Sequence, residues 1–205
     1  MTVPIVSIVG KGDSGKTTFL EKLIRELSGR GVRVATVKHH VHDYDIDVPG
    51  KDSWRHARAG AVTTMVSSPD KFSLIAKVER EYTLPELARI AEDSGADILL
   101  TEGFKQEATT RIEISRRARS ESLISLPEEL IALVTDNPDL APEGVPAYGL
   151  DDAVAVADLI CTRYLAGTVC GGTTRSSAGA EGDEDCLSMV PPRTAPDSAP
   201  NGGEV

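Results

Sequence analysis

Residues 10–17 read Gly-Lys-Gly-Asp-Ser-Gly-Lys-Thr and match the phosphate-binding pattern G-x-x-x-x-G-K-[ST] in full. Glycines in such a loop let the backbone wrap closely around a phosphate and turn its N–H groups inward. Lys16 would reach the β- and γ-phosphates, Thr17 offers a hydroxyl to Mg²⁺, and Thr18 is placed to meet the α-phosphate. We therefore predict a nucleoside triphosphate site formed by Gly10, Gly12, Asp13, Ser14, Gly15, Lys16, Thr17 and Thr18.

A carboxylate that could act with this loop follows a buried apolar run over residues 98–101. Glu102 would lie at the carboxyl end of that strand, which is where parallel sheets bind their ligands. A protein with a phosphate loop needs an acid there to organise Mg²⁺. We predict Lys16 and Glu102 as catalytic residues, and Thr17 and Glu102 as magnesium-binding residues.

Three of the four histidines, His39, His40 and His42, follow the second predicted strand, and aspartates alternate behind them. One interpretation is a Zn²⁺ or Ni²⁺ site, because imidazole and carboxylate groups suit these metals. The other is a loop that binds anions, senses Mg²⁺ and changes order with the γ-phosphate. We favour the second interpretation because adjacent histidines are poorly spaced for one coordination sphere.

A short basic run comes next, with Lys51, Arg55, His56 and Arg58 around one acid, Asp52. In an acidic chain this run indicates either a polyanionic second ligand or partner, or an ordinary solvated helix face.

Asp136 directly follows the apolar run 130–135 and precedes Asn137-Pro138. Guanine presents an N1–H and an exocyclic amine side by side, and one carboxylate accepts both, whereas adenine offers no such pair. Asp136 is therefore a candidate for guanine recognition, and an aspartate that caps a turn is the alternative.

The overall composition narrows the classes of function. The 205 residues include 22 Lys and Arg against 32 Asp and Glu, a net charge of −10, which argues against a broad nucleic-acid interface. No apolar run approaches the roughly 18–20 residues of a membrane span, and no basic leader indicates a signal peptide. Three cysteines are too few for a disulfide scaffold, so we expect a cytoplasmic protein.

Strand-like and helix-like patterns alternate along residues 3–165. This alternation is typical of a mostly parallel sheet with helices on both faces. We therefore predict an α/β fold of the P-loop NTPase class, with a GTP-binding domain over residues 1–166. Strands are predicted at 3–9, 32–37, 63–67, 72–78, 96–101, 111–115 and 130–135, and helices at 17–27, 53–59, 84–92 and 152–165.

The composition changes after Leu165. Residues 167–205 hold 7 of the 18 glycines and 4 of the 12 prolines and carry a net charge of −4. They lack periodic apolar residues that could offset the entropy of ordering, so we predict a disordered acidic tail. Cys170 and Cys186 could be half of a metal or cluster site, but no C-x-x-C pattern supports that.

The motifs occur in an order that resembles the molybdopterin-guanine dinucleotide biosynthesis protein B family. The resemblance covers roughly Pro4–Leu165. It rests on the phosphate loop, Val37-Lys38-His39-His40, Asp45-Ile46-Asp47-Val48-Pro49-Gly50-Lys51-Asp52-Ser53, Arg55-His56, Ala59-Gly60-Ala61, Glu102-Gly103-Phe104-Lys105 and Thr135-Asp136.

This resemblance implies a homodimeric protein that binds GTP and Mg²⁺ and has weak GTPase activity. It implies a partner, the guanylyltransferase that joins GMP to molybdopterin or its molybdenum form. Asp45 and Asp47 are implied as magnesium or switch residues, and Lys51 and Arg55 as contacts to a nucleotide or pterin phosphate. Slow hydrolysis would follow from the lack of an evident arginine finger or water-orienting glutamine in the motifs.

Two other functions fit the phosphate loop. One is a metallochaperone GTPase of the nickel-insertion kind, with metal bound by His39, His40 and His42. The other is a P-loop small-molecule kinase whose basic run holds the phosphate acceptor.

Overall fold

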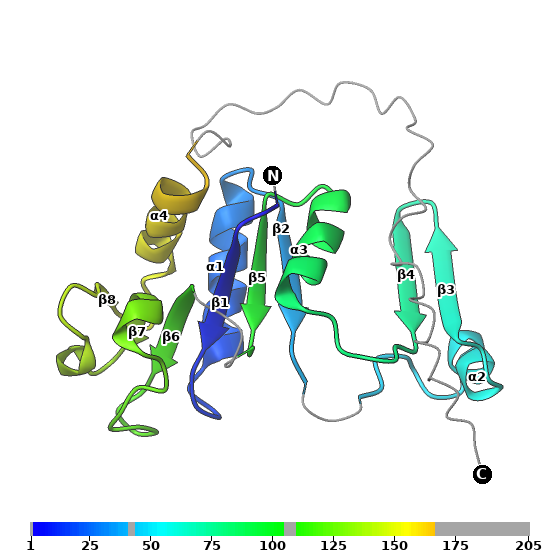
Figure 1. The fold of residues 1–205 in the computed structure, drawn as a ribbon, viewed down its shortest axis with the longest axis horizontal. Coiled ribbons are helices and arrows are strands. Elements are labelled where there is room, and N and C mark those ends of the chain that lie inside the picture. The colour runs from blue at the N-terminus through cyan, green and yellow to red at the C-terminus, as the bar shows by residue number, and fades with distance from the viewer. Residues whose placement is uncertain (1, 41–43, 105–109, 167–205) are drawn as a thin grey trace, which may run out of the picture. The chain divides into compact units, whose positions relative to one another are not determined.

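The computed structural model describes residues 2–40, 44–104 and 110–166, and the predicted tail at 167–205 lies outside them. Its largest element is a sheet built from β1 (Ile5–Val9), β2 (Val34–Lys38), β5 (Ile98–Glu102), β6 (Arg111–Ser115), β7 (Leu130–Thr135) and β8 (Ala147–Tyr148). The strand order is β2-β5-β1-β6-β7-β8, and each neighbouring pair is parallel (Figure 1). The prediction of a mostly parallel sheet is confirmed.

Helices cover both faces of this sheet, as predicted. On one face, α1 (Lys16–Gly29) and α4 (Ala153–Tyr164) share a core with alternate residues of the central strands, among them Ile98 and Leu100. On the other face, α3 (Leu84–Asp93) packs against Leu99 (Figure 1). This division follows from the strand backbone, because successive side chains point to opposite faces.

Two predicted strands do not join the main sheet. β3 (Thr63–Ser68) and β4 (Lys71–Ala76) form a separate antiparallel pair, and α2 (Asp52–Arg58) lies against β3. Large apolar side chains on this pair face solvent, and Met65 and Phe72 are 62% and 55% exposed. β4 alternates Phe72, Leu74 and Ala76 with other residues as a half-buried strand does, yet the described part of the chain leaves both faces of the pair largely uncovered.

The sequence missed β8 and two short 3₁₀ turns, Pro127–Glu129 and Pro138–Leu140. β8 has only two residues among prolines and glycines, so it shows no apolar periodicity of its own. It forms because β7 offers it a free edge, with Val134 opposite Tyr148.

Among the described residues, no helix is long and apolar enough to cross a membrane.

Candidate functional site

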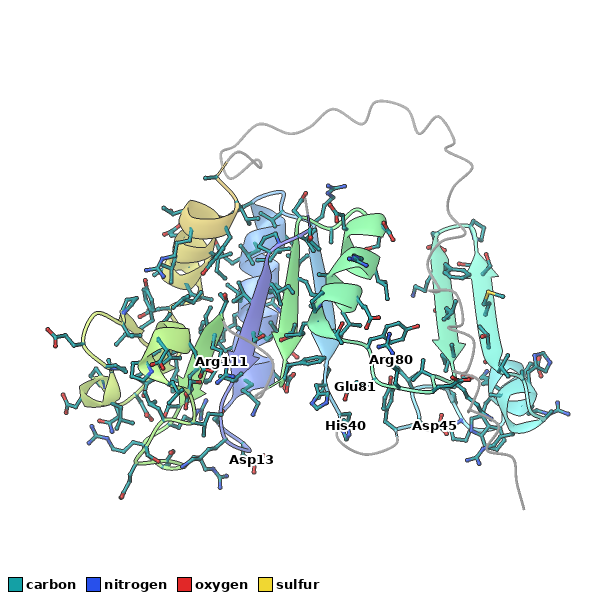
Figure 2. The ribbon with its side chains drawn as sticks, in the orientation of Figure 1. Asp13, His40, Asp45, Arg80, Glu81 and Arg111 are labelled. Carbon is teal, nitrogen blue, oxygen red and sulfur yellow. The ribbon has the colours of Figure 1, made fainter. Side chains whose placement is uncertain are left out.

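The phosphate loop joins the central strand β1 to the start of α1. Gly10 has φ +150°, and a Cβ built on it would stand 2.4 Å from the backbone oxygen of Ile114 and 2.7 Å from Ser14 Oγ. Only glycine allows this close approach, so the loop packs directly against the end of β6. Asp13, which has φ +56°, is exposed at the outer turn of the loop (Figure 2).

Two lysines brace the loop. Lys16, the first residue of α1, donates a hydrogen bond from Nζ to the backbone oxygen of Lys11 over 2.9 Å. Lys11 reaches in turn toward Ser122, with Nζ 3.4 Å from its Oγ. Ser14 Oγ is buried and has no hydrogen-bond partner among the described residues. The amino end of α1 adds backbone N–H groups and the positive end of the helix dipole, so the loop is suited to an anion.

The structure brings Thr17 and Glu102 together, although they are 85 residues apart. Thr17 Oγ1 lies 3.1 and 3.2 Å from the two carboxylate oxygens of Glu102. Lys38 Nζ, at the end of β2, lies 3.6 Å from the same carboxylate, which is largely buried. Hydroxyl and carboxylate oxygens are the ligands that Mg²⁺ prefers, so this pair fits the ion that the phosphate loop implies.

His39 makes structural contacts rather than joining a metal-binding cluster. Its Nε2 lies 2.7 Å from Glu81 Oε1, and its ring lies 4.7 Å from that of Phe104. His40 lies near Tyr44, and His42 is outside the described residues. Among residues 2–40, 44–104 and 110–166, no three His, Cys, Asp or Glu side chains could hold one metal ion.

The acids and bases expected after β2 have contacts of their own. Asp45 accepts a hydrogen bond from Trp54 Nε1 over 3.0 Å, and Asp47 accepts one from the N–H of Val48 over 2.8 Å. In the described part of the chain, neither aspartate bonds to Thr17 or Glu102. On α2, Arg55 lies 3.7 Å from Asp52, and Lys51 is exposed just before the helix. As contacts to Mg²⁺ or to a phosphate, Asp45, Asp47, Lys51 and Arg55 therefore stay predictions.

Asp136 links two loops at the carboxyl edge of the sheet. One of its carboxylate oxygens accepts the backbone N–H of Arg117 over 2.7 Å, and Arg117 Nη2 donates to Asn137 Oδ1 over 2.9 Å. Asp136 as a residue is exposed, and no hydrogen bond to its second carboxylate oxygen is found in the described residues. The arrangement is consistent with both the loop-capping and the guanine-binding interpretation.

Arg116 is the residue at this edge that sequence reasoning missed. It follows β6, and a Cβ built on Gly15 would stand 3.1 Å from its Nη2. No motif marks this arginine, because its place beside the phosphate loop depends on the pairing of β6 with β1. The sequence signal for Arg116 would have been a basic residue directly after a strand, where that strand pairs with the one that leads into the phosphate loop.

Comparison with known proteins gives the family. The model of the family described as "Molybdopterin guanine dinucleotide synthesis protein B" matches residues 5–136. The molybdopterin-guanine dinucleotide biosynthesis adapter protein of Escherichia coli is 35% identical over 163 residues, covering 77% of this chain and 91% of that protein. Its namesake from Haemophilus influenzae is 35% identical over 136 residues, covering 66% and 76%.

Solved structures agree with this result. The crystal structure of Bacillus subtilis MobB has a TM-score of 0.60 and 31% sequence identity, and the match covers 78% of this chain and 96% of that one. A MobB homologue from Bacillus stearothermophilus has the same TM-score at 25% identity. The family match, the curated relatives and the shared fold lead to one conclusion: this chain belongs to the molybdopterin guanine dinucleotide synthesis protein B family.

Proposed function

We propose that this protein is a GTP-binding adapter in the biosynthesis of the molybdopterin guanine dinucleotide cofactor. The observation that carries the proposal is the Thr17–Glu102 pair beside a complete phosphate loop, in a chain of this family. The relatives are named as adapter proteins of that biosynthesis. In this role the protein captures GTP and presents it to the guanylyltransferase that joins GMP to molybdopterin or its molybdenum form.

The residues of the loop have distinct tasks in nucleotide binding. Backbone N–H groups of residues 10–18 hold the phosphates, and Lys16 exchanges its bond to the Lys11 carbonyl for the β- and γ-phosphates. Thr17 and Glu102 hold Mg²⁺, which neutralises charge on the phosphates when it is bound. Glu102 is engaged by Thr17 and Lys38, so it organises the ion rather than abstracting a proton. We therefore expect only weak GTPase activity.

Guanine selection is assigned to Asp136. Its strand, β7, lies two places from β1 in the sheet, and its exposed carboxylate stands at the same edge as the phosphate loop. A carboxylate selects guanine over adenine because it accepts two neighbouring N–H groups at once. In the same proposal, Lys51 and Arg55 contact a phosphate of the pterin or the nucleotide. Asp45 and Asp47 belong to a loop that responds to Mg²⁺.

A homodimer is part of the proposal, and the β3–β4 pair supports it. Met65, Leu74 and Phe72 share one face of this pair, because Met65 lies opposite Leu74 and Phe72 lies opposite Ser67. A two-stranded sheet is marginal in water without a further strand or a covering layer. In the described part of the chain, both of its edges lack a partner strand. A second copy offers the same apolar face and edges and would supply both.

Calorimetric titration with GTP and then ATP, each with and without Mg²⁺, tests the proposal. We expect Mg²⁺-dependent binding of GTP, at least tenfold tighter than that of ATP, because a matched hydrogen-bonding edge gives at least that discrimination. Lys16→Ala should abolish binding of both nucleotides while the far-UV circular dichroism stays unchanged. Tighter binding of ATP would contradict the guanine assignment, and GTP turnover in the Lys16 variant would contradict the mechanism.

A further inference from the structure

Arg116 is placed beside the phosphate loop by the main sheet. It directly follows β6, which pairs with β1 so that Ile112 lies opposite Ile8 and Glu113 opposite Val9. β6 and β1 are parallel, so the residues after them meet at one edge. Arg116 therefore comes to the loop from the side opposite to Glu102, whose strand pairs with the other edge of β1.

The guanidinium turns one particular edge toward the loop. A Cβ built on Gly15 would stand 3.1 Å from Arg116 Nη2, 3.4 Å from Nε and 3.5 Å from the central carbon. The N–H bonds of Nε and Nη2 run parallel, so these nitrogens form one of the edges of a guanidinium that can bind a phosphate or carboxylate with two hydrogen bonds. Gly15, with φ +91° and no side chain, leaves room for this edge.

This edge has no acceptor within the described part of the chain. Arg116 Nε is buried and has no hydrogen-bond partner in residues 2–40, 44–104 and 110–166. A buried donor on a charged group is rarely left without a partner in a folded protein, and an absent ligand is one explanation. Ser14 Oγ, also buried and unpartnered, belongs to the same loop. The phosphate loop and the arginine beside it thus each contribute one buried polar group, Ser14 Oγ and Arg116 Nε, that has no partner in the described residues.

Asp151, an acid on which the charge of Arg116 acts, is already engaged by Lys22. Asp151 lies 2.6 Å from Lys22 Nζ, and this hydrogen bond is the main reason that the pKa of Asp151 is lowered; the charge of Arg116 lowers it further. Asp151 is also 91% exposed, and its hydrogen bond and ion pair in the described residues go to Lys22 and not to Arg116. No ion pair of Arg116 competes with a ligand in the described residues.

We infer that Arg116 binds the phosphate chain of the nucleotide held by residues 10–17, through the Nε–Nη2 edge of its guanidinium. This inference rests on the proposed function, because it requires a nucleotide on the loop. It adds to the nucleotide-binding residues an arginine in the same chain, which none of the motifs contains. Arg116 is a binding residue here, and its charge would offset that of the phosphates without a partner protein.

The test compares Arg116→Ala, Arg116→Lys and the control Arg119→Ala with the unaltered protein. Arg119 is an exposed arginine on the same segment and touches neither the loop nor Glu102 in the described residues. Binding of GTP and GDP is measured by calorimetry with Mg²⁺, and melting temperature is measured without nucleotide. Each chain is used at full length.

We expect Arg116→Ala to weaken GTP and GDP binding about 10- to 100-fold, the effect of hydrogen bonds to a charged group. Arg116→Lys should recover only part of this loss, because an ammonium cannot form the paired bonds. Arg119→Ala should bind as the unaltered protein does. Without nucleotide, the melting temperature of Arg116→Ala should not fall, because truncation removes a donor that had no partner.

Two results would overturn the inference alone. One is nucleotide affinity within twofold of the unaltered protein in Arg116→Ala. The other is a lower melting temperature of the nucleotide-free variant together with weaker binding, which would indicate a structural role. If the unaltered protein bound neither GTP nor GDP, the proposed function would fail and the inference with it.

Discussion

Glu102 illustrates how much one side chain at the edge of a sheet depends on its neighbours. Its carboxylate is largely buried and contacts the hydroxyl of Thr17 and the ammonium of Lys38. The negative charge of the Glu102 carboxylate is therefore stabilised by a hydroxyl on one side and an ammonium on the other. No arginine binds both of its oxygens in the described residues. Such a group can hold a magnesium ion or its water shell, and removing its charge should affect chemistry more than nucleotide binding.

We predict that Glu102→Gln lowers Mg²⁺-dependent GTP turnover about 10- to 100-fold, which is the usual effect of altering a residue that orients a metal or its ligands. The affinity for GTP should change much less, because the loop and Lys16 remain. Single-turnover hydrolysis and calorimetry check the two quantities separately. Glu81→Gln is the matched control, because Glu81 pairs with His39 and not with Thr17. Equal loss in both variants would contradict the assignment.

Among the elements, α3 shows how a helix start is stabilised by its own sequence. Thr83 and Glu86 form a capping box, and Glu86 accepts hydrogen bonds from the backbone N–H and the hydroxyl of Thr83 over 2.9 Å each. Arg80 donates to the same carboxylate. The pKa of Glu86 is lowered far below its ordinary value near 4.5, first by the Arg80 hydrogen bond and then by those of Thr83.

This cap should make stability depend on pH in one direction. Because the pKa of Glu86 is lowered in the folded state, the stabilisation is complete above the unfolded value near 4.5 and declines as pH falls below it. We predict that Glu86→Gln lowers the melting temperature at pH 7 and that the difference from the unaltered protein shrinks toward pH 3. Calorimetric melting across this range checks the prediction, and a difference independent of pH would count against it.

At the scale of the whole molecule, the protein presents two surfaces of opposite character. The carboxyl edge of the main sheet carries the phosphate loop, with Asp13 at its outer turn (Figure 2). Thr17 on α1, Glu102 at the end of β5, Arg116 after β6 and Asp136 after β7 lie at this edge. The β3–β4 pair instead carries exposed apolar side chains, and its strand edges have no partner strand within the described part of the chain. Exposed apolar patches of this kind usually mark an interface. The first surface suits a nucleotide, and the second suits another copy of the chain.

If the proposed homodimer forms, we predict that the double variant Met65→Glu/Phe72→Glu is a monomer in light scattering coupled to size exclusion, whereas the unaltered protein is a dimer. The two charges would lie on one face of the β3–β4 pair and would need burial in the dimer, which is costly for unpaired charges. GTP binding per chain should persist, since the phosphate loop belongs to the other sheet. Val154→Glu is the control, because Val154 is an equally exposed apolar residue on α4. A dimer that survives the double variant would exclude this interface.

Much of this molecule could be predicted from local patterns. The phosphate loop, the buried strands 98–102 and 130–135 and the helices around them follow from residue spacing, because each feature involves chemistry or periodicity within about twenty residues. The position of Glu102 could be predicted because a residue directly after a buried parallel strand lies at the carboxyl edge of the sheet, where such sheets bind their ligands. The two residues of β8 could not be predicted, because their conformation comes from the neighbouring strand.

Other features depended on contacts between distant residues. Arg116 stands beside Gly15 only because β6 pairs with β1, and the sequence around it shows an ordinary basic loop. For His39 the sequence left a metal site and an anion-binding loop as alternatives, and its contacts with Glu81 and Phe104 are visible only in the tertiary structure. The sequence by itself determined the fold class, the phosphate loop and the family motifs. Tertiary structure decided which side chains meet around the loop, because strand order, and not spacing along the chain, determines that edge.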